Sequence, residues 1–123
     1  MIINPSEAAS NAMLDVLAGM MDGGSIEVSD NGKVLAVLKL SNPAARSAAG
    51  GELVFNKITD EDAARAQGNA SSARIVAADG SEVFSCDVGD KNSAAVIRLD
   101  TTRIFRDGLV RLHSFRLVMP SGR

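Results

Sequence analysis

The stretch GGSIEVSDNGKVLAVLKL, residues 23–40, is the part of the sequence that decides the fold. Within it, Ile26 and Val28 alternate with polar residues, and a second apolar run covers residues 34–38. Asn31-Gly32 stands between the two runs. This dipeptide signals a two-residue hairpin, because a type I′ turn needs positive φ at both central positions, which Asn and Gly reach at least cost. The stretch therefore predicts a β-hairpin, which we take as the start of an all-β domain.

Further short strands are expected after the hairpin, each bounded by turn-forming residues. They are predicted at residues 53–55, 64–66, 72–78, 82–88, 94–99 and 109–119. Their inward-facing side chains are predicted to be Ala73, Ile75, Ala77, Phe84, Cys86, Val88, Ile97 and Leu99. Turn signals at intervals of about 8–12 residues are typical of sandwiches and barrels. We expect a mainly β fold in one domain: a helix with a short arm at 1–22, and an antiparallel β-sandwich or barrel at 23–123.

The last expected strand changes phase along its length. Val110 and Leu112 share one face, with Arg111 and His113 opposite, but after Ser114 the apolar set is Phe115, Leu117 and Met119, which have the other parity. A one-residue change of phase predicts either a bulge or a strand that leaves one sheet and enters another.

One amphipathic helix is expected ahead of the hairpin, from Pro5 to Met21. Asn4 is suited to cap it, with Pro5 in the first helical position, and Asp22-Gly23-Gly24 is suited to end it. The apolar positions run at spacings of 3, 4 and 7: Met13, Val16, Leu17, Met20 and Met21, with Ala9 and Ala12 behind them. Such a stripe either packs against a sheet, which we favour, or offers an adaptable methionine-rich binding surface.

The composition narrows the classes of function. A chain of 123 residues suits one domain, and 46% apolar residues are enough for a modest core. The aromatic residues are all Phe, with no Trp or Tyr, which disfavours sugar-stacking lectins and single-strand nucleic-acid binders. A pI near 5.3 also disfavours nucleic-acid binding. Neither a signal peptide nor a membrane-spanning run is recognisable, so we expect no membrane partner and synthesis in a cytoplasm.

Charge is distributed unevenly along the chain. Residues 1–97 carry seven basic and thirteen acidic residues, a net charge of −6, whereas residues 98–123 carry six Arg and two Asp, a net charge of +4. This asymmetry indicates either a docking surface for an acidic partner or simply the solvent-facing side of strands, which alternation alone predicts.

No catalytic or metal-binding constellation is recognisable. His113 and Cys86 are the only residues of their kind, and a metal site needs further His or Cys ligands. We expect His113 to face solvent or a partner, Cys86 to be a small buried hydrophobe, and the acidic run at 60–62 to cap a surface loop. The expectation is a protein that is not an enzyme and that uses no cofactor and no metal.

The order of these segments resembles a known class of proteins. The helix with Leu14-Asp15-Val16-Leu17 and Gly23-Gly24 precedes the hairpin, followed by Leu35 to Ala44, ARIVAADG at residues 73–80, Asp87-Val88-Gly89 and a closing run at 110–115. This order is similar to that of small virion proteins of tailed bacteriophages, in particular head-decoration (cement) proteins. Many of those proteins carry Trp or Tyr around the position of Arg74, and this chain has neither there.

The resemblance implies a compact, jelly-roll-like, antiparallel β-sandwich at residues 23–123. It also implies a structural protein that docks on the outside of an expanded capsid and bridges neighbouring major capsid subunits. It implies the major capsid protein and further copies of the chain, as a homodimer or homotrimer, as partners, and the virion exterior as location. The interface candidates are the arm and the cationic C-terminal region: Met1, Ile2, Ile3, Arg103, Phe105, Arg106, Arg111, His113 and Arg116.

Two alternatives stay open at this stage. One is another structural position in the same particle, such as a tail, neck or tail-tube protein. The other, from a different class, is a ligand-binding or enzymatic jelly roll of the cupin kind, which needs several His ligands where this chain has one.

Overall fold

The predicted hairpin is confirmed by the computed structural model, which describes residues 5–119. Strand β1 (Ser25–Asp30) pairs antiparallel with β2 (Lys33–Lys39), and Asp30 lies opposite Lys33. Asn31 and Gly32 form the two-residue loop, with φ angles of 48° and 86°. Positive φ at both positions is the geometry of the expected type I′ turn.

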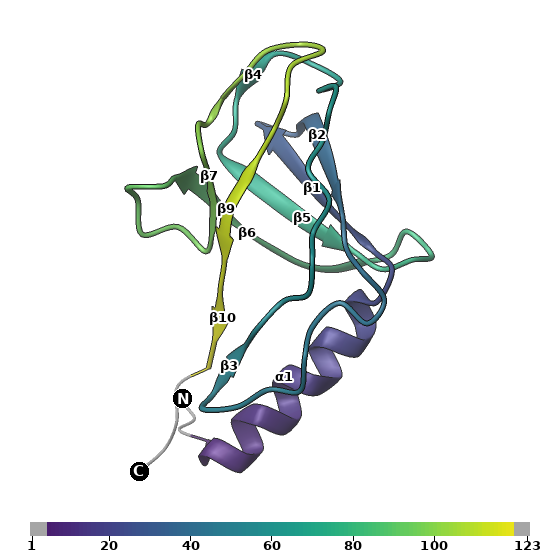
Figure 1. Cartoon of the computed structure of the whole chain (residues 1–123), viewed down its shortest axis with the longest axis vertical. Coiled ribbons are helices and arrows are strands. Elements are labelled where there is room, and N and C mark those ends of the chain that lie inside the picture. Colours follow the sequence, from purple (N-terminus) through teal and green to yellow (C-terminus); the bar gives the residue numbers. More distant parts are fainter. Residues whose placement is uncertain (1–4, 120–123) are drawn as a thin grey trace.

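Six strands form one sheet in the order β2-β1-β5-β6-β7-β9 (Figure 1). The added members are β5 (Ser72–Val76), β6 (Glu82–Asp90), β7 (Ile97–Leu99) and β9 (Leu112–Phe115). Two small ladders accompany the sheet: β3 (Glu52–Leu53) with β10 (Leu117–Val118), and β4 (Gly68–Asn69) with β8 (Arg103–Ile104). Residues 5–119 are mainly β with one helix, and the mixed sheet curls into a half-barrel. The expected sandwich or jelly roll is not confirmed.

Three bulges account for the curl. The register shifts by one residue on β2 at Leu35, on β6 at Val83 and on β9 at His113. A bulge bends its strand and increases the local twist, so three of them along one sheet turn it toward a barrel. The first bulge also explains why the neighbours Leu35 and Ala36 are both buried.

The expectation of purely antiparallel pairing is wrong at one place. β6 and β7 run parallel, with Val88 opposite Ile97. The connection between them bonds back to its own start, where the backbone N–H of Val96 donates to Asp87 and Ser93 Oγ donates to the Asp90 carbonyl. The chain therefore reverses twice outside the sheet and re-enters beside β6 in the same direction.

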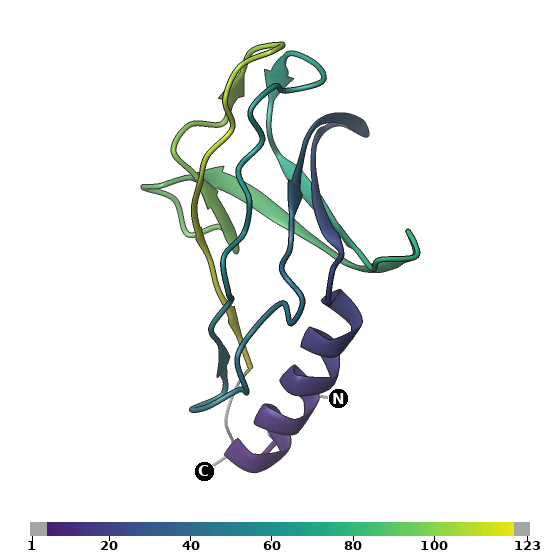
Figure 2. The same cartoon turned by 45° about the vertical axis from the view of Figure 1, so that its right-hand side comes forward.

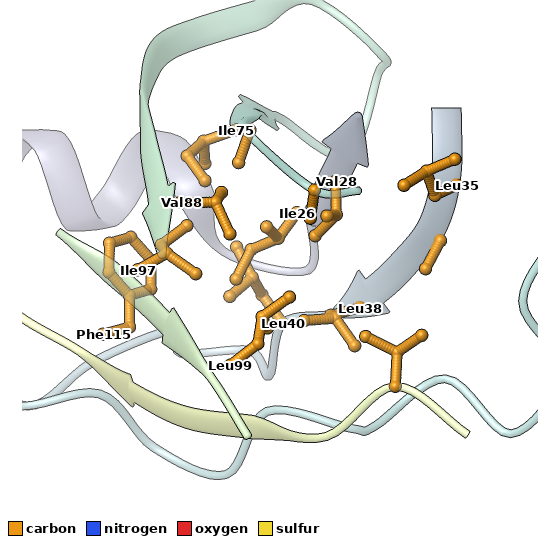
Figure 3. Packing of buried hydrophobic residues seen from close by; sticks show 14 of the residues in the cluster. Ile26, Val28, Leu35, Leu38, Leu40, Ile75, Val88, Ile97, Leu99 and Phe115 are labelled. Atoms are coloured by element: carbon orange, nitrogen blue, oxygen red, sulfur yellow. The ribbon is translucent and has the colours of Figure 1, made fainter. Parts of the chain in front are cut away.

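The core lies on the concave face of the sheet (Figure 3). Ile26 of β1 stands between Leu38 of β2 and Ile75 of β5, and all three side chains are fully buried. Of the predicted inward residues, Ala73, Ile75, Val88, Ile97 and Leu99 are buried, while Ala77, Phe84 and Cys86 are half-buried. The core is aliphatic apart from Phe115, as the composition predicts.

The predicted helix exists, but its start and its buried face differ from the expectation. α1 (Glu7–Met21) begins after Ser6, whose hydroxyl accepts a hydrogen bond from the backbone N–H of Ala9, so Ser6 is the N-cap. The proposed cap Asn4, like the arm residues Met1, Ile2 and Ile3, lies outside the described residues. The buried side chains are Ser10, Leu14, Ala18 and Met21, whereas Met13, Val16 and Met20 are exposed.

The helix packs against the β3–β10 ladder and the loop before it, below the curled sheet (Figures 1 and 2). Leu14 and Ala18 form a second buried cluster with Leu53 of β3. Asp15 accepts a hydrogen bond from the backbone N–H of Ala48, which joins the same side of the helix to the loop. The buried face of α1 is therefore the one with Leu14 and Ala18, and the predicted face with Met13, Val16 and Met20 lies in solvent.

The predicted phase change in the last strand is confirmed, and both expected devices occur. The bulge at His113 separates Ser114, which lies opposite Arg98, from Leu112, which lies opposite Leu99. After Phe115 the chain leaves the large sheet, and β10 pairs with β3 instead. The edge strand expected at residues 64–66 is wrong: this segment has bends and no strand.

Close backbone approach at Gly24 gives a test of how the helix is seated on the sheet. A Cβ added at Gly24 would lie 2.0 Å from the backbone oxygen of Val76, whereas one added at Gly19 in α1 would meet nothing within 4 Å. We expect Gly24→Ala to lower the free energy of unfolding by about 1–3 kcal/mol or more through overpacking. We expect the control Gly19→Ala to raise it by about 0.5–1 kcal/mol, because alanine favours helix. Urea unfolding measures both, and equal effects would contradict the close approach.

Candidate docking surface

One exposed cluster of interface-type side chains lies at the end of β8 and in the loop after it; we call it the tip and define it as Arg103, Phe105, Arg106 and Leu109. Phe105 is 57% exposed and Leu109 is 53% exposed. The loop lies beside β4 at one end of the long axis, and α1 lies at the other end (Figures 1 and 2). An exposed aromatic ring flanked by arginines is the composition that protein interfaces favour.

Backbone hydrogen bonds hold the tip in place. The N–H of Asp107 donates to the Ala64 carbonyl at 2.8 Å, and the N–H of Ala64 donates to the Gly108 carbonyl at 2.9 Å. Gly108 also donates to the Phe105 carbonyl at 2.9 Å. Asp107 has a φ of 65°, the left-handed conformation that closes the turn. The tip is therefore ordered before it meets a partner, which lowers the entropy lost on binding.

The two arginines of the tip keep their charge available. Both Arg103 and Arg106 are exposed, and neither forms an ion pair within residues 5–119. Sequence reasoning selected Arg103, Phe105 and Arg106, and the structure brings them together on one loop. It missed Leu109, whose exposure becomes evident only once Val110 is seen to point into the core.

The remaining predicted arginines line a separate groove of about 520 Å³ between residues 52–60 and β9. Leu53 lies opposite Leu117 at one end of this groove, and Glu61 pairs with Val110 at the other. Between these pairings no backbone hydrogen bond joins the two segments within the described chain. The rings of Phe55 and Phe115 stack across the gap, with centroids 4.3 Å apart and planes within 10°.

Ion pairs across the groove neutralise its arginines. Arg116 donates from Nε and Nη2 to the two carboxylate oxygens of Glu52, at 3.0 and 2.9 Å. Arg111 lies 3.9 Å from Asp60, whose other oxygen accepts a hydrogen bond from the backbone N–H of Leu112. Sequence reasoning missed both carboxylates, because Arg116 lies 64 residues from Glu52, and Leu112, which donates to Asp60, lies 52 residues from it along the chain. The groove therefore offers paired charges, whereas the tip offers free positive ones.

His113 stands apart from both features. It is exposed at the bulge of β9, and its Nδ1 lies 3.7 Å from an Asp100 carboxylate oxygen. This position agrees with the expectation that it faces outward. The arm candidates Met1, Ile2 and Ile3 lie outside the described residues.

Cys86 lies on the half-buried side of β6. Burial, and secondarily the negative charge of Asp87, raise the pKa of its thiol to about 11. At neutral pH the thiol is therefore protonated, and the thiolate is the reactive form.

Other observations concern metals, membranes and relatives. Within the described range, no three His, Cys, Asp or Glu side chains are close enough to hold a metal ion. No helix among residues 5–119 has the length and apolar character needed to cross a bilayer.

No family model, no curated protein and no solved structure matches this chain.

The Arg116–Glu52 pair predicts a shifted titration. The hydrogen bonds from Arg116, and then its charge, hold the pKa of the Glu52 carboxyl below its usual value. A lowered folded-state pKa stabilises the fold above the unfolded pKa, and this contribution is lost as pH falls through the folded pKa. We expect Arg116→Met to return the Glu52 pKa to its ordinary range, measured by NMR titration of the side-chain carboxyl. The control Arg103→Met should leave the Glu52 pKa unchanged, and an equal response to both variants would contradict the pairing.

The raised pKa of Cys86 predicts slow alkylation. At pH 8 we expect iodoacetamide to modify the folded chain at least about 100-fold more slowly than the chain unfolded in urea, because so little thiolate is present. Ser85→Cys is a matched control, since Ser85 is exposed on the same strand and faces the other way. That variant should show one fast and one slow thiol by mass spectrometry. Two equally fast thiols would contradict the protected position.

Proposed function

We propose that this chain is a structural virion protein that binds the outside of a bacteriophage capsid and cements neighbouring major capsid subunits. The proposal joins the order of segments in the sequence to the chemistry of the tip. In this role the protein is not an enzyme, and its working part is a surface that fits another protein.

The observation that carries the proposal is the tip. Phe105 is held exposed between Arg103 and Arg106 by a hydrogen-bonded loop. Burying such a ring in a partner pocket gives much of the energy of an interface, and arginine is enriched at the same positions. The unpaired guanidinium groups favour a partner surface that carries carboxylates.

The mechanism is stabilisation by mass action. A protein that binds only the assembled and expanded shell lowers the free energy of that state in proportion to the logarithm of its free concentration. In this proposal the tip contacts the major capsid protein, and self-association of the chain links one contact to the next. The same proposal includes the fold. The half-barrel forms one layer of a jelly-roll-like sandwich, and the β3–β10 ladder belongs to the second layer.

A binding experiment with empty heads tests the proposal. The probe is expanded heads assembled from the major capsid protein that is encoded in the same gene cluster. We expect the chain to bind these heads at saturable stoichiometry and to raise their melting temperature. Phe105→Ala is expected to weaken binding at least about tenfold, because truncation of a central aromatic residue has that cost at interfaces.

Charge variants separate a specific role of the tip from general attraction. Arg106→Glu is expected to weaken head binding, whereas Lys91→Glu makes the same change of charge on the exposed β6–β7 loop and is expected to leave it unchanged. Absence of any melting shift at saturating protein would refute the proposal. Binding to tail tubes in place of heads would move the chain to the alternative position in the particle.

A further inference from the structure

The helix α1 has a second apolar face, which the protein leaves in solvent. We call it the α1 seam and define it as Ala9, Met13, Val16 and Met20. Met13 is 45% exposed, Val16 is 67% exposed and Met20 is 53% exposed. Ala9 is also exposed. Large apolar side chains gathered on one exposed helix face mark an interaction site more often than single exposed ones do.

Three polar side chains on α1 and at its C-terminal end bond to one loop, on the flank of the helix away from the seam. Asn11 accepts a hydrogen bond from the backbone N–H of Gly51, Asp15 accepts one from Ala48, and Asp22, just after the helix, accepts one from Ala44. These three residues therefore face the loop that covers the opposite flank of α1. No charged residue belongs to the seam, all of whose positions are described. An uncharged face fits an apolar partner and gives no attraction for an acidic or basic one.

We propose that the α1 seam binds the α1 seam of a second copy of this chain in an antiparallel pair. The seam residues are spaced by 4, 3 and 4, which is the spacing of a helix–helix seam. This spacing reads the same in both directions, so a two-fold axis midway between Met13 and Val16 makes the surface self-complementary. The axis places Ala9 opposite Met20, and Met13 opposite Val16.

The antiparallel arrangement packs better than a parallel one. Ala9 opposite Met20 sets a small side chain against a long one, and the same exchange recurs at the other end by symmetry. A parallel pair would set Ala9 against itself and Met20 against itself, leaving a gap at one end and crowding at the other. The helix dipoles also oppose each other when two helices are antiparallel. Ala12 and Gly19, which border the seam, allow the two backbones to approach closely.

The size of the contact sets the strength of the pair. α1 is about 22 Å long at 1.5 Å per residue. A single helix pair of that length buries less than the roughly 1,200 Å² typical of stable complexes, so we expect a dissociation constant in the micromolar range or weaker. The tip lies at the far end of the long axis from α1 (Figure 1), so pairing through the seam leaves both tips free. Pairing through the seam would supply the self-association on which the proposed function rests, but the test of this pairing needs no capsid.

Sedimentation velocity of the purified chain, from about 5 to 500 μM, tests the pairing. We expect a reversible monomer–dimer equilibrium that Val16→Glu weakens at least about tenfold, since it buries a charge against apolar side chains. Val16 is exposed, so this variant should keep its circular dichroism and melting temperature. The control Ala8→Glu adds the same charge on an exposed position outside the seam and should change the dissociation constant less than twofold.

Disulfide trapping tests the orientation. Met13→Cys and Val16→Cys are prepared separately, mixed in equal amounts and oxidised, and the unsubstituted chain reports any background from Cys86. In the antiparallel pair position 13 faces position 16, so the mixed disulfide should clearly exceed the half of the product that random pairing gives. An excess of the two homodisulfides would overturn the antiparallel pairing. A monomer at every concentration would overturn the inference altogether, while capsid binding would still be judged by the head assay alone.

Discussion

The structure depends on the register of β1 between its two neighbours. Ile26 is fully buried between Leu38 and Ile75, and Val28 occupies the next row between Ala36 and Ala73. Because side chains alternate with period two, a one-residue slip would turn these rows to the solvent side. The two-residue turn at Asn31-Gly32 fixes one of the two registers, since few other residue pairs adopt positive φ twice in succession. The concave core is built outward from this point.

The bulges and the divided last strand follow from covering that core with one sheet. A flat sheet of six strands would leave its inner face open, and the three bulges bend it around the aliphatic side chains. The chain then leaves β9 and pairs as β10 with β3, which closes the end where α1 sits. The same departure opens the groove between residues 52–60 and β9, where Phe55 and Phe115 stack across the gap.

Exposed apolar groups are concentrated at the two ends of the molecule. Phe105 and Leu109 are at the tip, and Met13, Val16 and Met20 are on α1. Both sets sit on elements that hydrogen bonds hold in place, the tip by Ala64 and the helix by the loop of residues 44–51. Two ordered contact surfaces at opposite ends suit a protein that joins a partner at one end to its own copy at the other. The groove, with its internally paired arginines, fits that role less well.

The sequence did not predict the short strands β4 and β8. By itself it determined the hairpin, the strands β5, β6, β7, β9 and β10, the helix near its observed bounds and the phase change of the last strand. Each of these depends on local geometry: turn residues, alternation and caps. It also selected Arg103, Phe105 and Arg106, because arginines are concentrated in the C-terminal region of the chain. Only the tertiary structure decided which stripe of α1 is buried, since two stripes of similar spacing compete and the one with Leu14 and Ala18 packs against Leu53 of β3. It also decided the parallel pairing of β6 with β7 and the neutralisation of Arg116 by Glu52. These features join residues far apart in the chain, and no local preference encodes a partner at such a distance.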